Sequence, residues 1–156
     1  MKKIGMYTAR GIVSEDNTTA GNPQLIPLYD GSFKTAYRVK EFYIWGATWN
    51  NTTNPDCIGK LSKNNTGTTG AVNFMRADDD NQIAWAGSNG GTDSPGVEFD
   101  NFVVDPDNLV VEDLYVYVRI GGDSAQPINY MVVMEKFEIS ESQGALLMAR
   151  DRADGE

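Results

Sequence analysis

Residues 109–120, LVVEDLYVYVRI, contain the pattern that decides the fold of this chain. A mostly aliphatic set of side chains alternates with a more polar and aromatic set along this stretch, as in a strand whose successive residues point to opposite faces. One face has Val110, Leu114, Val116, Val118 and Ile120, with Glu112 as an exception, and the other has Leu109, Val111, Asp113, Tyr115, Tyr117 and Arg119. We therefore predict a half-buried strand from Leu109 to Ile120.

A second long strand is predicted from Ile128 to Ile139, because Ile128, Tyr130, Val132 and Met134 share one face. The intervening residues 121–127, GGDSAQP, contain the Gly and Pro of a hairpin loop. We therefore expect these two strands to be hairpin partners.

A third long strand is predicted from Phe33 to Gly46, and its pattern shifts by one residue along its length. Tyr37 and Val39 lie on one face, whereas Phe42 and Ile44 fall on the other. One extra residue near Lys40-Glu41 would return all four to the same side, which predicts a β-bulge or a bend there.

Shorter strands separated by polar, Asn- and Gly-rich loops complete the pattern. They are predicted at Gln24–Tyr29, Cys57–Ser62, Gly70–Met75, Gln82–Ala86 and Val97–Val104. About eight strands without interleaved helices indicate an all-β fold, an antiparallel β-sandwich of the jelly-roll kind.

One short helix is predicted at the C-terminal end, with Ser140 as N-cap and Gln143 completing a capping box. It packs either on its own sandwich or on a neighbouring molecule. Residues 1–156 form a single domain in this interpretation, with an N-terminal arm (1–21), a sandwich (22–139) and the helix (140–152).

Composition limits the class of protein. Hydrophobic residues make up 40% of the 156 residues and charged residues 22%, so the chain should fold around its own core without a cofactor. Its single cysteine, Cys57, excludes a disulfide within the chain and is predicted to be a small buried hydrophobe.

The charge balance argues against nucleic acid and the hydropathy against a membrane. Thirteen basic and 22 acidic residues give a net charge of −9, and no dense Lys/Arg run reverses it. No stretch approaches the roughly 20 apolar residues of a membrane helix, and the first residues lack the apolar run of a signal peptide. We therefore expect a soluble protein made in the cytoplasm, with no direct nucleic-acid or membrane partner.

The absence of histidine excludes a Ser-His-Asp triad and removes the commonest zinc ligand. We predict no catalytic residues, no cofactor and no metal. Two alternatives stay open. Glu41, Glu112 and Glu135 lie within predicted strands and could supply the paired carboxylates of a glycosidase. Oxygen ligands for calcium could come from Asp78-Asp79-Asp80 or from residues 105–108, DPDN.

Aromatic residues offer a further alternative, a sugar-stacking platform or a protein interface, although core packing is their commoner role. The set comprises Trp45, Trp49, Trp85, Tyr29, Tyr43, Tyr115 and Tyr117. Trp49 is the ligand-stacking candidate, because it adjoins a wholly polar loop.

Several segments make the chain similar to a family of small proteins. They are DPDNLVVEDL (105–114), INY (128–130), EKFEIS (135–140), GAL (144–146) and IPLYDGSFKTAYRV (26–39). Over residues 24–152 the chain resembles small virion structural proteins of marine and environmental bacteriophages. The resemblance implies a capsid or capsid-decoration component, located in the virion, whose partners are further copies of itself and other virion proteins.

Under this hypothesis the two ends of the chain are the expected subunit contacts, because strand edges and mobile ends suit symmetric association. The candidates are Lys2, Lys3, Arg10, Leu146, Leu147, Arg150 and Arg152. A carbohydrate-binding or host-attachment β-sandwich is the alternative from another class.

Overall fold

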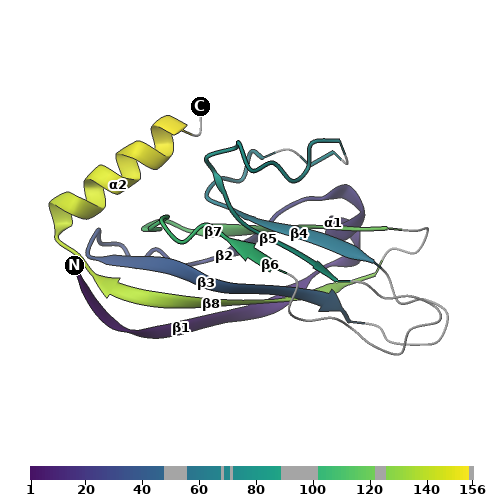
Figure 1. Ribbon diagram of the computed structural model, residues 1–156, viewed down its shortest axis with the longest axis horizontal. Helices are drawn as coiled ribbons and strands as arrows, with labels where there is room; N and C mark the ends of the chain where they lie inside the picture. The colour runs from purple at the N-terminus through teal and green to yellow at the C-terminus, as the bar shows by residue number, and fades with distance from the viewer. Residues whose placement is uncertain (48–55, 68, 71, 89–101, 122–125, 155–156) are drawn as a thin grey trace.

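The computed structural model describes residues 1–47, 56–67, 69–70, 72–88, 102–121 and 126–154, which form eight strands and two helices (Figure 1). The elements are β1 (Lys2–Val13), α1 (Glu15–Ala20), β2 (Gln24–Ile26), β3 (Thr35–Gly46), β4 (Cys57–Ser62), β5 (Gln82–Ser88), β6 (Phe102–Val104), β7 (Leu114–Ile120), β8 (Ile128–Glu138) and α2 (Glu141–Asp154).

The strands form two sheets in which every pairing is antiparallel. Three strands make one sheet in the order β1-β8-β3, and five make the other in the order β2-β7-β4-β5-β6. One large apolar cluster, drawn from strands of both sheets, fills the space between them. The predicted all-β antiparallel sandwich is therefore confirmed.

The order of pairing is that of a jelly roll, a long hairpin rolled up on itself. The first strand pairs with the last, β2 with β7, and β4 with β5. The remaining nested pair, β3 and β6, lies side by side, with the Tyr43 and Phe102 ring centroids 5.1 Å apart. In the described residues β6 pairs with β5 instead, which leaves three strands in one sheet and five in the other.

Strand β3 contains the predicted bulge. Its register with β8 shifts between Val39 and Glu41, so Lys40 is the extra residue. Tyr37, Val39, Phe42 and Ile44 consequently all face the core and are at most 7% exposed.

The predicted hairpin between residues 109–120 and 128–139 is wrong, because β7 and β8 belong to different sheets. Strand β7 also begins only at Leu114. Val110 forms an isolated bridge with Tyr37 of β3, and the Asp113 carboxylate accepts hydrogen bonds from the backbone of Leu28 and Tyr29. These contacts pull residues 110–113 out of the β7 ladder.

The N-terminal segment is part of the sandwich rather than an arm. Residues 2–13 pair with β8 along almost its whole length, and only Ala9 and Val13 of β1 are buried. The apolar residues of β1 are mostly exposed and do not alternate with polar ones, which is why the sequence suggested an arm. The short helix α1 follows, and the hydroxyl of its buried Thr18 donates to the backbone oxygen of Gln126.

Of the shorter predicted strands, only Cys57–Ser62 has the predicted bounds: Gln24–Tyr29 ends at Ile26, and Gln82–Ala86 continues to Ser88. Residues 72–75 of the predicted strand Gly70–Met75 form turns and bends, with Val72 exposed and Phe74 buried. Of the predicted strand Val97–Val104, only β6 is seen, and residues 97–101 lie outside the described part of the chain.

Helix α2 packs on its own sandwich, which resolves the alternative that the sequence left open. The backbone N–H of Gln143 donates to Ser140 Oγ at 3.2 Å, so the predicted N-cap is present. Met148 joins a second apolar cluster with Ala36, Val111, Phe137 and Ile139. From this anchor α2 runs toward the loop that follows β4 (Figure 1).

Candidate functional site

The outward face of the three-stranded sheet is the first candidate. Residues paired directly across antiparallel strands point to the same side of a sheet, so the registers define this outer sheet face. It comprises Lys3, Met6, Thr8, Arg10 and Ile12 of β1, Asn129, Met131, Val133, Glu135 and Phe137 of β8, and Ala36, Arg38, Glu41, Tyr43 and Trp45 of β3. Lys40, the extra residue of the bulge, also belongs to it, because its charge helps to lower the pKa of Glu135. The second apolar cluster covers Ala36 and Phe137 at one end of the face.

Apolar side chains on this face remain open to solvent. Met6 is 54% exposed and Ile12 49%, while Met131, Val133 and Trp45 are partly exposed between charged neighbours. Exposed apolar surface with polar groups around it often indicates a site of contact with another molecule.

Strand β1 borders this face as a long open edge. It is 12 residues long, whereas β2 and β6, the edges of the other sheet, have three residues each. The opposite edge, β3, is engaged by the Val110 bridge and by Phe102. Open edges invite pairing, and proteins limit it with charges and bulges. Strand β1 has both, a register shift between Lys3 and Gly5 and the exposed side chains of Lys2, Lys3 and Arg10.

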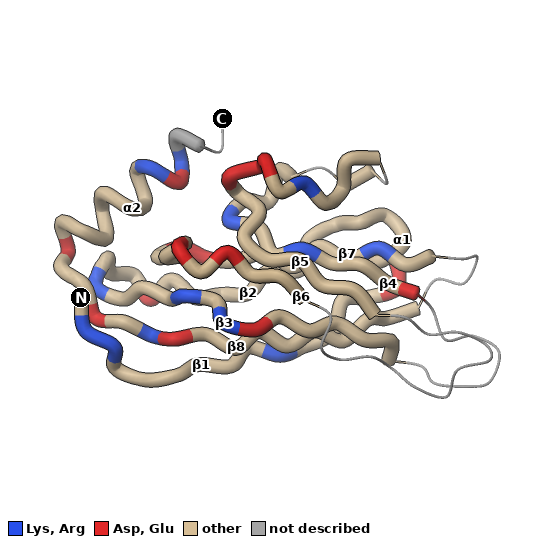
Figure 2. The backbone as a smooth tube through the Cα atoms, viewed as in Figure 1, with Lys and Arg blue, Asp and Glu red and all other residues tan. Residues whose placement is uncertain are grey.

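Charge separates the two sides of the molecule. Strands β1, β3 and β8 contain six of the 13 basic residues but only three of the 22 acidic ones, a net charge of +3. The remainder of the chain therefore has seven basic and 19 acidic residues, a net charge of −12. Segments 76–80 and 105–113, here called the acidic side, hold seven acidic residues and one basic residue. Figure 2 shows their red segments away from β1.

One ion pair and one hydrogen bond engage the two carboxylates of the outer sheet face. Lys3 Nζ lies 2.9 Å from the Glu135 carboxylate, and this hydrogen bond holds the pKa of Glu135 below its ordinary value. Glu41 accepts the hydroxyl of Tyr43 at 2.9 Å. Both carboxylates on this face are thus engaged within the chain, whereas Arg10 and Lys40 extend into solvent.

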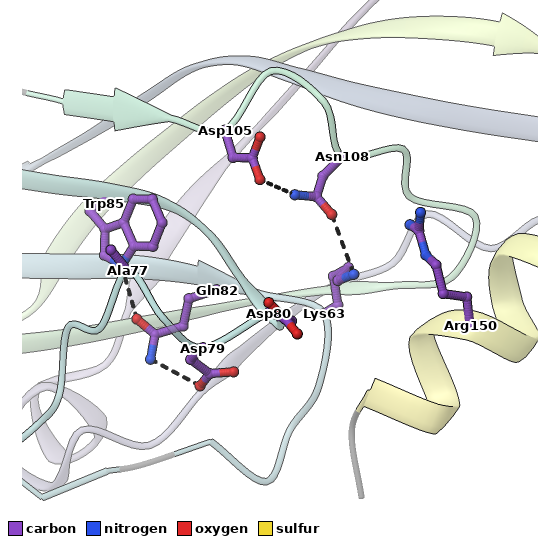
Figure 3. A pocket seen from close by; sticks show the side chains of 9 residues that line it. All are labelled: Lys63, Ala77, Asp79, Asp80, Gln82, Trp85, Asp105, Asn108 and Arg150. Atoms are coloured by element: carbon purple, nitrogen blue, oxygen red, sulfur yellow. Dashed lines mark hydrogen bonds between the residues drawn. The ribbon is translucent and has the colours of Figure 1, made fainter.

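A polar cleft under α2 is the second candidate, and Lys63 is at its centre (Figure 3). Lys63 Nζ lies 2.8 Å from Asp151 Oδ1, with the two side chains only 4% and 9% exposed, and 3.4 Å from Asn108 Oδ1. The Asn108 amide donates in turn to Asp105. This buried network holds the last turns of α2 against the sandwich, beside a cavity of about 220 Å³.

A separate cavity, which shares Lys63 with the first, is lined by two tyrosines. Tyr29 and Tyr115 line a cavity of about 240 Å³ with Lys63, Glu112 and Asp113. Asp113 Oδ1 accepts the backbone N–H of Tyr29 at 3.0 Å and so places this residue at the rim. Burial, and then the charges of Asp113 and Glu112, raise the pKa of the Tyr115 hydroxyl, so it stays a neutral donor.

A buried cation lies on the outward side of the five-stranded sheet, under the loop of residues 63–81. Lys60 is fully buried, and its Nζ donates to the backbone oxygen of Phe74 at 2.6 Å. The same nitrogen lies 4.3 Å from the Phe74 ring centroid and 4.9 Å from that of Tyr117. Such cation–π geometry is strongest when water is excluded. Sequence reasoning missed this site, because Lys60 alternates with core residues and reads as a surface lysine.

The predicted contact residues are spread over three places. Lys2, Lys3 and Arg10 are exposed on β1, and Leu146 is 72% exposed on α2. Leu147 instead packs against the second apolar cluster of its own chain. Arg150 lines the Lys63 cleft, and Arg152 pairs with Glu112 at 2.9 Å. Trp49 lies outside the described residues.

The carboxylates considered for catalysis do not share one cleft. Glu112 lines the tyrosine cavity next to Lys63, whereas Glu41 and Glu135 lie on the open outer sheet face. The aspartates considered for calcium are engaged in turns and pairs: Asp78 with Arg76, and Asp79 with Gln82. Within the described ranges no three His, Cys, Asp or Glu residues are grouped to hold a metal ion.

No helix in the described part of the chain is long and apolar enough to span a membrane. Comparisons with protein-family models, with curated proteins and with solved structures give no match.

Proposed function

We propose that this chain is a structural subunit of a virus particle, a capsid or capsid-decoration component that assembles with copies of itself and with other virion proteins. The observation that carries the proposal is the outer sheet face, a three-stranded surface with exposed apolar side chains, bordered by the 12-residue edge of β1. A jelly roll is an architecture of viral capsid domains, which supports the proposal by analogy of fold alone.

The physical basis is that burial of the exposed apolar groups on this face would favour association. Met6 and Ile12 at the edge, with Met131 and Val133 between the strands, form its apolar part. Side chains of this kind contribute about 25 cal/mol for each Å² removed from water. The termini add a second contact surface in this proposal, because Leu146 of α2 also projects into solvent.

The test is the association state of the purified full-length protein from about 1 µM to about 100 µM, by sedimentation velocity and electron microscopy. The variant Met6→Gln/Ile12→Thr removes apolar surface from the outer sheet face without adding charge. Its matched control, Ile58→Thr/Val103→Thr, removes aliphatic groups that are 41% and 65% exposed on the other sheet. We expect the wild type and the control to form defined oligomers and the first variant to be monomeric. A wild type that stays monomeric throughout would refute the proposal.

A second candidate function, carbohydrate binding, is favoured by the cavity that Tyr29 and Tyr115 line together with the carboxylates of Glu112 and Asp113. Aromatic rings can stack on the apolar face of a sugar, while carboxylates accept its hydroxyl groups. The test is a glycan array followed by titration of any bound sugar. Tyr29→Ala should abolish binding at this cleft and Tyr43→Ala, on the outer sheet face, should not. An array without a hit would remove this candidate.

A further inference from the structure

We infer that the outer sheet face of one molecule docks on the acidic side of a second copy, so that the chain associates head to tail through two different surfaces. This inference rests on the proposed function, since it specifies how the subunits would meet. It commits to a second copy of the same chain as the occupant of the outer sheet face.

Charge complementarity is the first reason. The outer sheet face has four basic residues, Lys3, Arg10, Arg38 and Lys40, and two acidic ones, Glu41 and Glu135, a net charge of +2. Arg10 and Lys40 are exposed to solvent. The acidic side has Asp80 and Asp107 exposed, while Asp79 and Asp105 hold turns through hydrogen bonds to Asn81 and Asp107 backbone N–H groups. Each molecule thus has one surface with an excess of basic residues and another with an excess of acidic residues.

Symmetry is the second reason. A two-fold contact brings the same surface of both partners together, so the excess positive charge of the outer sheet face would meet itself. The face keeps a net charge of +2 even when both of its carboxylates, Glu41 and Glu135, are counted, and Glu135 is already paired with Lys3 of its own chain. Like charges placed opposite each other disfavour association, and contact between opposite charges favours it.

The size of the face sets the strength of a single contact. Strands of 12 residues at ~3.3 Å each, spaced ~4.8 Å apart, give three strands an area of roughly 600 Å². Stable interfaces use about 800 Å² on each partner, so one such contact is weak. A head-to-tail contact can repeat, however. After two copies have bound, one of them still has an unoccupied outer sheet face and the other an unoccupied acidic side, so further copies can add at both ends. The assembly is a closed ring if the rotation between neighbouring subunits brings the last copy back to the first, and an open array if it does not.

Charge reversal tests the inference. Variant one is Arg10→Glu/Lys40→Glu on the outer sheet face, and variant two is Asp80→Lys/Asp107→Lys on the acidic side. Each mutated surface repels its wild-type counterpart, but the two mutated surfaces attract each other. We expect each variant alone to associate about tenfold or more weakly than the wild type, and an equimolar mixture to recover wild-type association. Recovery in the mixture also shows that both variants are folded.

Salt supplies an independent measurement, since exposed charges are screened. Raising NaCl from about 50 mM to about 500 mM should weaken association of the wild type by about tenfold or more. Normal association of both variants alone, or no recovery in the mixture, would overturn the head-to-tail inference. The proposed function would survive that result if Met6→Gln/Ile12→Thr still abolished assembly. A wild type that never associates would overturn both.

Discussion

The ammonium of Lys60 contacts Phe74 in two ways. It donates a 2.6 Å hydrogen bond to the backbone oxygen of Phe74, and it lies 4.3 Å from the centroid of the Phe74 ring. The two residues come from β4 and from the loop that covers it. Lys60 therefore holds residues 72–81 against the five-stranded sheet, and the rings of Phe74 and Tyr117 cover the cation.

Replacement of Lys60 by methionine should destabilise the fold by about 1–3 kcal/mol, because it leaves the buried oxygen of Phe74 without this donor. The loss is limited, since methionine keeps much of the volume and removes a buried charge. Urea unfolding measures the effect. Lys34→Met, at an exposed lysine, is the matched control and should change stability by less than about 0.5 kcal/mol. Equal stability of Lys60→Met and the wild type would contradict the role of this contact.

Stability should depend on pH through the same residue. Burial lowers the pKa of the Lys60 ammonium, so the folded state loses this proton before the unfolded state does as pH rises. The cost of the buried charge is fully present at neutral pH and is relieved above the folded pKa. The stability advantage of the wild type over Lys60→Met should thus grow from about pH 7 to about pH 10. Tyr117, whose pKa burial raises, contributes to both proteins and cancels in this difference. A constant or shrinking difference would contradict the prediction.

Gly144 is expected to be required for docking of α2. A Cβ at this position would lie 1.9 Å from the backbone oxygen of Phe33, a distance that no side-chain movement relieves. Helix propensity alone predicts that Gly144→Ala stabilises the helix by about 1 kcal/mol. We expect the opposite sign, a loss of about 1–3 kcal/mol from overpacking, with faster tryptic cleavage at Arg150 and Arg152.

Ser142→Ala, at an exposed position of the same helix, serves as control and should leave proteolysis unchanged. If Gly144→Ala proved more stable than the wild type and equally resistant to trypsin, the helix would not depend on close approach to Phe33.

Local periodicity explains why much of the sandwich could be predicted. Strand β4 has the predicted bounds, Cys57–Ser62, and the bulge at Lys40 follows from the reversed phase of Tyr37 and Phe42. Alternation reports which side of a strand is buried, and that property depends only on neighbouring residues.

Pairing between strands could not be predicted in the same way. The Gly- and Pro-containing segment 121–127 has the composition of a hairpin loop, yet β7 and β8 lie in different sheets. Composition shows where a strand ends but not which strand it joins next. Strand β1 was missed for a related reason, since few of its side chains face the core.

For the candidate sites too, local features could be predicted from the sequence and contacts between distant segments could not. The exposed charges Lys2, Lys3 and Arg10 could be identified along the chain, but not their position on an open edge. Tyr29 and Tyr115 come together only because β2 pairs with β7, a contact between distant segments. The burial of Lys60 depends on Phe74, which lies in a loop over the sheet. The alternation of residues within a strand does not indicate whether a loop will cover that strand.

Cys57 should be unreactive in the folded protein. It is 3% exposed, and burial raises the pKa of its thiol to about 12, so the reactive thiolate is almost absent at neutral pH. Ellman's reagent at about pH 8 should detect no thiol in the native state and one per chain in denaturant. Because the unfolded thiol ionises first, the stability that it contributes is present below about pH 9 and falls as pH rises further. Rapid native-state reaction would show that β4 opens locally.

The ion pair of Lys63 and Asp151 should contribute far more than that of Arg152 and Glu112, although the two pairs have nearly equal distances of 2.8 and 2.9 Å. The first pair is almost excluded from solvent, whereas the Arg152 side chain is 69% exposed. Removing one partner of a buried pair costs about 3–5 kcal/mol when the other charge is left without compensation. Asp151 would keep only the half-exposed Arg150, whose Nη2 lies 3.3 Å from Asp151 Oδ1, so the cost should fall toward the lower end of this range. An exposed pair typically contributes about 0–1 kcal/mol.

Lys63→Met should therefore destabilise the protein strongly and release the end of α2, and Lys63→Met/Asp151→Leu should recover most of the loss, because no buried charge is then left alone. Arg152→Met and Arg152→Met/Glu112→Leu form the matched cycle at the exposed pair, where both changes should be small. Urea unfolding gives the free energies, and hydrogen exchange of the amides in residues 148–152 reports release of the helix. Equal coupling energies in the two double-mutant cycles would contradict this prediction. They would mean that water screens the Lys63–Asp151 pair despite its low exposure, and that the Met148 cluster alone holds α2.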